Sequence, residues 1–144
     1  MKKFAILNGP NLNRLGKREP HIYGTATLKD LEQLVRAEAK RLGVGVTFFQ
    51  SNHEGALIDK IQALADEGIA GFIVNFGAYS HTSIALHDAL KSVAVPAIEV
   101  HISDIKTREE FRRHSMTAGA CVAMISGQGF PGYVQALQQR VDRS

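Results

Sequence analysis

The sequence predicts an α/β fold in which helices cover both faces of a parallel sheet. Short apolar runs of strand length alternate with segments of helical period along the whole chain, a pattern typical of parallel strands joined by helices. A length of 144 residues, 44% of them hydrophobic, suits one domain with a substantial core. We therefore expect a single domain over residues 1–144.

Apolar segments bounded by turn residues predict strands at residues 4–8, 44–49, 71–75, 96–101 and 121–126. Helical periodicity predicts helices from about 27 to 43, 55–67 and 83–93, a short charged helix over 108–114, and a last helix from Pro131. Alternation of this kind indicates a flavodoxin-like, doubly wound five-stranded sheet. In such sheets the ligand crevice lies beyond the carboxyl ends of the strands.

Capping residues and apolar spacing mark the first two long helices. Thr27 and Asp30 form a capping-box pattern, and Gly43 is suited to end the helix. The spacing of apolar residues predicts two buried faces, formed by Leu28, Leu31, Leu34 and Val35 in the first helix and by Ala56, Ile58, Ile61 and Leu64 in the second.

Residues 9–24 form a connection much longer than the usual length of about 4–6 residues. Arg18 precedes Tyr23 by five residues, and a guanidinium brought close to a phenol favours the phenolate. The composition of the segment predicts a loop that closes over a polar, anionic ligand. For Arg18 and Tyr23 taken alone, two surface residues are the favoured interpretation over a catalytic pair.

The run from Ile98 to Ile102 alternates apolar and polar residues. Side chains alternate across a strand, so Glu99 and His101 share one face. A carboxylate beside an imidazole fixes the tautomer and favours its protonation, which suits a general acid. A solvated edge strand is the alternative interpretation.

Residues 75–83 connect a predicted strand to a helix and hold several polar groups. Gly77 allows close backbone approach, Thr82 or Ser83 can cap the helix, and helix amino ends attract anions. Asp88 lies two turns beyond His81 on roughly the same side, although a solvated helix face or a subunit contact would equally explain it.

Charge and composition argue against several classes of partner. The net charge of +3 is spread along the chain without a basic block, which disfavours nucleic-acid binding and suits a small anionic substrate. No apolar run approaches the roughly 18 residues of a membrane span, and the apolar stretch at residues 4–7 is shorter than the ~7 residues of a signal peptide. We expect a cytoplasmic protein without membrane association, with Cys121 as a buried core thiol.

Metal and dinucleotide sites are also disfavoured. The six histidines show no paired helical spacing and no cysteine partner. The glycine pattern of residues 127–132 resembles a dinucleotide-binding turn, but no strand follows it and no acidic residue lies about 20 positions on. We expect these glycines to serve tight helix packing.

Several motifs together resemble the type II 3-dehydroquinate dehydratases over nearly the whole chain. They are LNGPNLN (7–13), GKREP (16–20), YG (23–24), QSNHEG (50–55), NFGAYSH (75–81), IEVHIS (98–103) and REEFR (108–112). The resemblance implies dehydration of 3-dehydroquinate to 3-dehydroshikimate by anti elimination through an enolate, without a metal or organic cofactor.

The resemblance also implies roles for individual residues. Tyr23 is the expected base, with Arg18 stabilising its phenolate; Asn11 stabilises the enolate through a water; His101, backed by Glu99, is the acid. The implied substrate-binding residues are Asn75, His81, Asp88, Ile102, Ser103 and Arg112, with Arg108 a further candidate.

The resemblance further implies a homo-oligomer, a dodecamer built from trimers. The chain departs from the family pattern at Phe76, at Ala56 and over residues 115–120, and we expect none of these to touch a proposed catalytic side chain. A weakly active or regulatory paralogue and a non-enzymatic flavodoxin-like binding module stay open as alternatives. Aromatic biosynthesis and quinate breakdown use the same dehydration, so both pathways also stay open.

Overall fold

Five parallel strands form one sheet in the order β2-β1-β3-β4-β5. The computed structural model describes residues 1–17 and 19–144, with the side chains of Ile22 and Tyr23 outside the description. The strands are β1 (Lys3–Asn8), β2 (Gly45–Gln50), β3 (Gly71–Asn75), β4 (Ala97–His101) and β5 (Ala123–Ser126). This arrangement confirms the predicted flavodoxin-like α/β fold and puts β4 inside the sheet, between β3 and β5.

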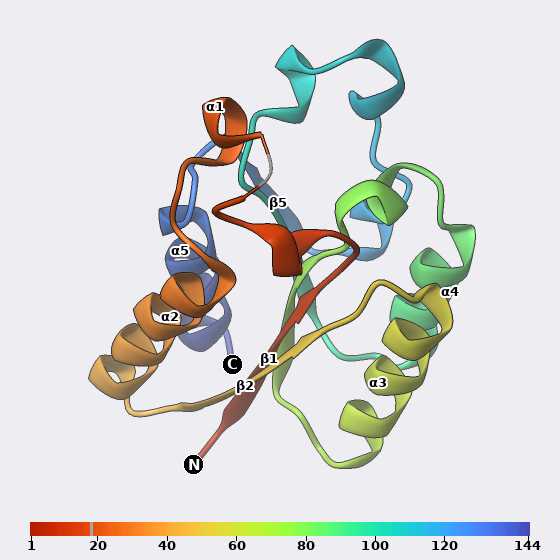
Figure 1. The fold of residues 1–144 in the computed structure, drawn as a ribbon. Helices are drawn as coiled ribbons and strands as arrows, with labels where there is room; N and C mark the ends of the chain where they lie inside the picture. Colours follow the sequence, from red (N-terminus) through yellow and green to blue (C-terminus); the bar gives the residue numbers. More distant parts are fainter. Residues whose placement is uncertain (18) are drawn as a thin grey trace.

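Helices cover both faces of the sheet (Figure 1). One face packs against α2 (Leu28–Leu42) and α5 (Pro131–Asp142), and the other against α3 (Glu54–Asp66) and α4 (Ile84–Ser92). Along β1, Phe4 and Ile6 belong to the first core, and Ala5 and Leu7 to the second. Successive side chains of a strand point to opposite faces, so a strand buried on both faces reads as a continuous apolar run.

Helix α2 begins and ends as its sequence predicts. The Thr27 hydroxyl accepts a hydrogen bond from the Asp30 amide at 3.2 Å, and the Asp30 carboxylate accepts one from the Thr27 amide at 2.9 Å. Gly43 ends the helix with a φ of 73°, in the left-handed region that glycine adopts readily.

Each of the buried faces expected for α2 and α3 includes two residues that are not fully buried, Leu28 and Leu34 in α2 and Ala56 and Ile58 in α3. Leu31 and Val35 are fully buried, but Leu34 is 41% exposed, so its expected burial was wrong. In α3 the face against the sheet is formed by Leu57, Ile61 and Leu64. Ala56 and Ile58 are only partly buried, because the i, i+4, i+7 row through Leu57 faces the core.

The charged helix predicted over residues 108–114 does not form. Two 3₁₀ turns occupy the region, η3 (Ile105–Thr107) and η4 (Glu110–Arg112), and η4 buries none of its residues. A segment without an apolar stripe has no face to pack against the sheet. The connection at residues 9–24 also contains secondary structure, a 3₁₀ turn η1 (Leu12–Arg14) and a short helix α1 (Pro20–Tyr23).

The prediction that the glycines after β5 serve helix packing is confirmed at Gly132, whereas Gly127 and Gly129 adopt left-handed backbone conformations before the helix. A Cβ on Gly132 would lie 3.3 Å from the Val100 Cγ1 atom and 3.4 Å from the Ile125 Cγ2 atom, tighter than ordinary contact.

Cys121 is partly rather than fully buried. Burial, aided by the charge of Glu99, raises the pKa of its thiol to about 12.

Within the described part of the chain, every helix is too short or too polar to cross a membrane.

Candidate active site

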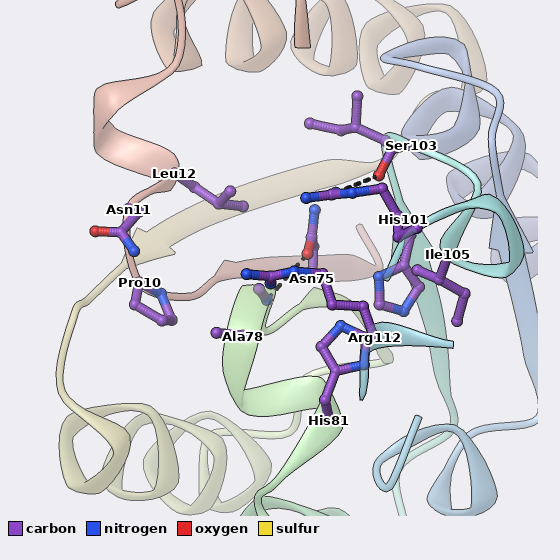
Figure 2. Close-up of a pocket in the computed structure, with 13 residues that line it drawn as sticks. Pro10, Asn11, Leu12, Asn75, Ala78, His81, His101, Ser103, Ile105 and Arg112 are labelled. Carbon is purple, nitrogen blue, oxygen red and sulfur yellow. Dashed lines mark hydrogen bonds between the residues drawn. The ribbon is translucent and has the colours of Figure 1, made fainter. Parts of the chain in front are cut away.

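A polar cavity lies at the carboxyl ends of β1, β3 and β4. The space between its lining residues is about 600 Å³, open solvent at its mouth included. Its lining residues are Pro10, Asn11, Leu12, Asn75, Gly77, Ala78, His81, His101, Ile102, Ser103, Ile105, Arg108 and Arg112. Figure 2 shows Pro10–Leu12 on one side, His101 and Arg112 on the other, and Asn75 between them. The edge predicted for the ligand crevice is therefore where the cavity forms.

Glu99 and His101 form a buried pair at the end of β4. Glu99 is 0% and His101 5% exposed, and β4 is flanked by strands on both sides, so the alternative of a solvated edge strand is wrong. The His101 Nε2 atom lies 2.7 Å from the Glu99 Oε2 atom. An ionised carboxylate only accepts hydrogen bonds, so Nε2 carries a proton and Nδ1 is the ring nitrogen left for proton transfer.

Two hydroxyl groups from the segment before β5 also contact Glu99. The Ser115 hydroxyl donates to Oε2 at 2.6 Å, and the Thr117 hydroxyl donates to Oε1. Burial raises the pKa of Glu99, but the hydrogen bonds and charge of His101 and these hydroxyls outweigh it, leaving the pKa below its ordinary value. The expectation that residues 115–120 touch no proposed catalytic side chain was therefore wrong.

His81 lies beside His101 at the edge of the cavity. Its Nδ1–H donates to the His114 carbonyl at 2.8 Å, and the two imidazole centroids are 6.0 Å apart. Burial lowers the pKa of His81 most, and the electrostatic effects of His101 and Arg112 lower it further. The hydrogen bond to the His114 carbonyl raises the pKa, but the net effect is a decrease. His81 is thus a neutral imidazole at neutral pH, with Nε2 as a hydrogen-bond acceptor.

Asn75 is oriented by Tyr133, a fully buried residue of α5. The Tyr133 hydroxyl donates to the Asn8 side-chain oxygen at 2.7 Å and accepts from the Asn75 Nδ2 atom at 2.9 Å. The Gly77 amide donates to the Asn75 side-chain oxygen at 3.1 Å. With its oxygen and one N–H so used, Asn75 presents its remaining N–H as a donor to the cavity. Sequence reasoning missed Tyr133 because an aromatic residue on a helix reads as core.

Asn11 stands on the opposite wall in a left-handed conformation, with a φ of 71°, which asparagine tolerates better than most residues. Its amide donates to the Asn52 side-chain oxygen at 3.0 Å, and the Gln50 side-chain amide donates to the same oxygen at 3.2 Å. The Tyr79 hydroxyl donates to the Asn52 carbonyl at 2.9 Å. Polar residues after β2 thus hold the start of the long connection.

Arginines and a serine line the rim of the cavity near β4. The Arg108 guanidinium donates to the Ser103 hydroxyl at 3.0 Å. Arg108 and Arg112 both contact the Glu109 carboxylate, at 3.5 and 3.0 Å. Both guanidinium groups line the cavity, and guanidinium groups match the geometry of carboxylates, which favours an anionic ligand.

One predicted site residue, Asp88, does not line this cavity, and two others fall outside the described part of the chain. The Asp88 side chain is 72% exposed and lies 3.2 Å from the His87 Nδ1 atom, and it does not line the cavity. Arg18 and the Tyr23 side chain lie outside the described residues. Among the residues that are described, no cluster of three or more His, Cys, Asp or Glu side chains could hold a metal ion.

Known proteins resemble the chain over almost its whole length. Residues 2–141 match the sequence model of the family described as dehydroquinase class II. A 3-dehydroquinate dehydratase of Caldicellulosiruptor saccharolyticus is 53% identical over 137 residues, which are 95% of this chain and 94% of the relative. The crystal structure of type II dehydroquinase from Butyrivibrio crossotus superposes with a TM-score of 0.95 at 46% identity, covering 96% of this chain and 97% of that one. Type II dehydroquinase from Propionibacterium acnes gives 0.94 at 42%, covering 99% and 97%.

Proposed function

The chain belongs to the class II dehydroquinase family, whose members are hydro-lyases, and on this premise we propose that it converts 3-dehydroquinate to 3-dehydroshikimate by anti elimination of water through an enolate. The observation that carries the proposal is the buried Glu99–His101 pair, which supplies an acid at the floor of a polar, positively charged cavity.

His101 is proposed as the acid that protonates the departing hydroxyl. Glu99 holds the Nε2–H of the ring at 2.7 Å and stabilises the imidazolium form. Nδ1 then carries the proton that is given to the leaving group. A positioned acid of this kind contributes roughly 10²–10⁴-fold to a rate.

Tyr23 is proposed as the base that removes the proton alpha to the ketone, with Arg18 favouring its phenolate. Proton removal leaves negative charge on the ketone oxygen, and fixed donors near that oxygen lower the barrier. Asn11 is proposed to stabilise this enolate through a bound water, because it lies on the wall of the cavity opposite His101 (Figure 2).

The remaining cavity residues are proposed to bind the substrate. Backbone amides at Ile102 and Ser103 receive the carboxylate, with Arg108 and Arg112 adding positive charge at the rim. Asn75 donates to a ring hydroxyl and His81 accepts from one, in keeping with the hydrogen bonds that orient both side chains.

Asp88 is proposed to act in a neighbouring copy of the chain. It is exposed and lies outside its own cavity, which suits contact with a second subunit in a dodecamer built from trimers. We also propose a cytoplasmic location, and a place in either aromatic biosynthesis or quinate breakdown that gene neighbourhood will distinguish.

The proposal is tested by incubating the purified protein with 3-dehydroquinate and following the ultraviolet absorbance of the conjugated enone product. Absence of a signal under buffered conditions contradicts it. Borohydride added with substrate should trap no covalent adduct, because no lysine lines the described cavity; an adduct seen by mass spectrometry contradicts the mechanism.

Tyr23→Phe should abolish most turnover while leaving ligand binding nearly intact, because it deletes the base and retains the anion contacts. Turnover is measured by the same absorbance assay, and binding of 3-dehydroshikimate by calorimetry. A Tyr23→Phe protein with parental turnover rules out Tyr23 as the base.

A further inference from the structure

We propose that Thr117 and Ser115 are positioning residues for the acid step, which hold Glu99 as a carboxylate behind His101 and thereby keep the transferable proton on the imidazole. The proposal deepens the function proposed above and rests on it wherever turnover is the measurement. It concerns a segment whose sequence departs from the family pattern.

Three side chains donate hydrogen bonds to the Glu99 carboxylate, and together they use both of its oxygens. Oε2 accepts from His101 at 2.7 Å and from Ser115 at 2.6 Å, while Oε1 accepts from Thr117. The Ser115 hydroxyl oxygen itself accepts from the Ala118 amide at 3.1 Å. The Ser115 hydroxyl also lies 3.4 Å from the Ser80 carbonyl, but the Glu99 carboxylate is nearer and charged, which makes it the better acceptor for the hydroxyl hydrogen. Glu99 and Thr117 are both 0% exposed. A buried carboxylate needs such donors, because leaving its oxygens unpaired is costly.

The segment that carries the two hydroxyls is also tied to His81. The Met116 amide donates to the Ser80 carbonyl at 2.7 Å, and Ser80 precedes His81 in the 3₁₀ turn η2 (Gly77–His81). The carbonyl of His114 accepts from the His81 ring at 2.8 Å. Residues 114–117 therefore contact both the Glu99–His101 pair and His81, and they fix the relative positions of the two histidines.

Two other titratable groups near Glu99, His81 and Cys121, stay uncharged. His81 is the nearest titratable group on η2, and its lowered pKa keeps it neutral. Cys121 follows η5 (Ala118–Ala120), and its pKa of about 12 keeps it a thiol. The hydroxyls of Ser115 and Thr117 favour the ionised form of Glu99. If Glu99 took up a proton, it would no longer stabilise an imidazolium.

Thr117→Val removes one donor with little change of shape. Without that donor the pKa of Glu99 rises, so Glu99 becomes protonated at a higher pH. We expect the acid limb of the kcat profile to move up by about one pH unit, and kcat to fall roughly tenfold or more. The basic limb and KM should change little, because Thr117 does not line the cavity. Thr117→Ser keeps the hydroxyl and should restore both kcat and the acid limb.

Ser83→Ala is the matched control. Ser83 is 3% exposed, its hydroxyl donates to the Glu54 carboxylate, and it caps α4. Its loss should lower the melting temperature without moving the acid limb. A structural role for Thr117 would give this same pattern in Thr117→Val and would overturn the proposal.

A measurement without substrate separates this proposal from the proposed function. The carboxyl carbon of Glu99 is followed by ¹³C NMR in glutamate-labelled protein across pH, with the signal assigned from Glu99→Gln. Thr117→Val should shift the titration to higher pH, and Thr117→Ser should not. If Thr117→Val does not fold, Ser115→Ala is expected to give the same direction of shift. Identical titration in the parent and the valine or alanine variant overturns the proposal, whether or not the parent turns over 3-dehydroquinate.

Discussion

The two walls of the cavity are built differently. The wall formed by β4 and η2 carries His101, which is 5% exposed and bonded to a fully buried carboxylate. The wall formed by the start of the long connection carries Asn11, which is exposed and held through its backbone amide in a left-handed conformation. One wall is part of the sheet, and the other is attached to it by polar contacts.

This difference matches the demands of an elimination reaction. An acid must be kept in one tautomer and one protonation state, and burial with several donors achieves this. The wall that acts on the other side of the substrate ring must first let the substrate enter the cavity, and a long connection allows this. The proposed base, Tyr23, belongs to the same connection as Asn11.

The largest effect is expected from the sheet wall. His101→Asn should lower kcat by roughly 10²–10⁴-fold, because it removes the acid and keeps a polar side chain of similar size. Turnover is measured by enone absorbance, with His53→Ala as the control, since His53 is exposed and does not line the cavity. Near-parental kcat in His101→Asn would show that the sheet wall does not supply the acid.

A smaller effect is expected behind the sheet wall, at Tyr133. Tyr133→Phe leaves the Asn8 oxygen and one Asn75 N–H without a partner, and each unsatisfied buried group costs about 1–3 kcal/mol. We expect a lower melting temperature and a KM raised roughly tenfold, because Asn75 is no longer held in one orientation. Tyr79→Phe is the control, because the Tyr79 hydroxyl contacts Asn52, which holds the connection wall, and this variant should change KM less. Equal effects of the two variants would contradict the contrast between the walls.

The smallest effect is expected from the connection wall. Asn52→Ala removes the acceptor of the Asn11 amide, a hydrogen bond worth about 1 kcal/mol, so kcat should fall only a few-fold. Asn52→Asp keeps an acceptor oxygen and should retain most activity. The pH profile should keep its acid limb in both variants, because neither touches Glu99. A loss as large as that of His101→Asn would mean that Asn11 is fixed as firmly as the acid.

The fold was largely predictable because local patterns determine it. The strand at Gly71–Asn75 has its predicted bounds, and the other strands differ by a few residues at most. The Thr27 cap and the Gly43 stop are encoded in neighbouring residues. Leu34 was misassigned because three-residue and four-residue spacings define a stripe wider than the face that the sheet covers.

The site was predictable only where the chemistry lies on one strand or one loop. Glu99 and His101 are two residues apart, so strand alternation places them together. The contacts that support them join distant residues: Thr117 is 18 positions from Glu99, and Tyr133 is 125 from Asn8. The periodicity of a sequence does not predict contacts between such distant residues, because these contacts depend on how the segments pack in three dimensions.

The place of β4 inside the sheet has a consequence for how this protein can change. Strand β4 pairs with β3 on one side and with β5 on the other, so most substitutions there would reduce folding and turnover together. Residues 10–12 line the same cavity from outside the sheet, and none of the three belongs to either hydrophobic core. Selection for altered ligand preference should therefore accumulate replacements at residues 10–12 and spare β4, and a library randomised at both places would reveal this bias among its surviving members.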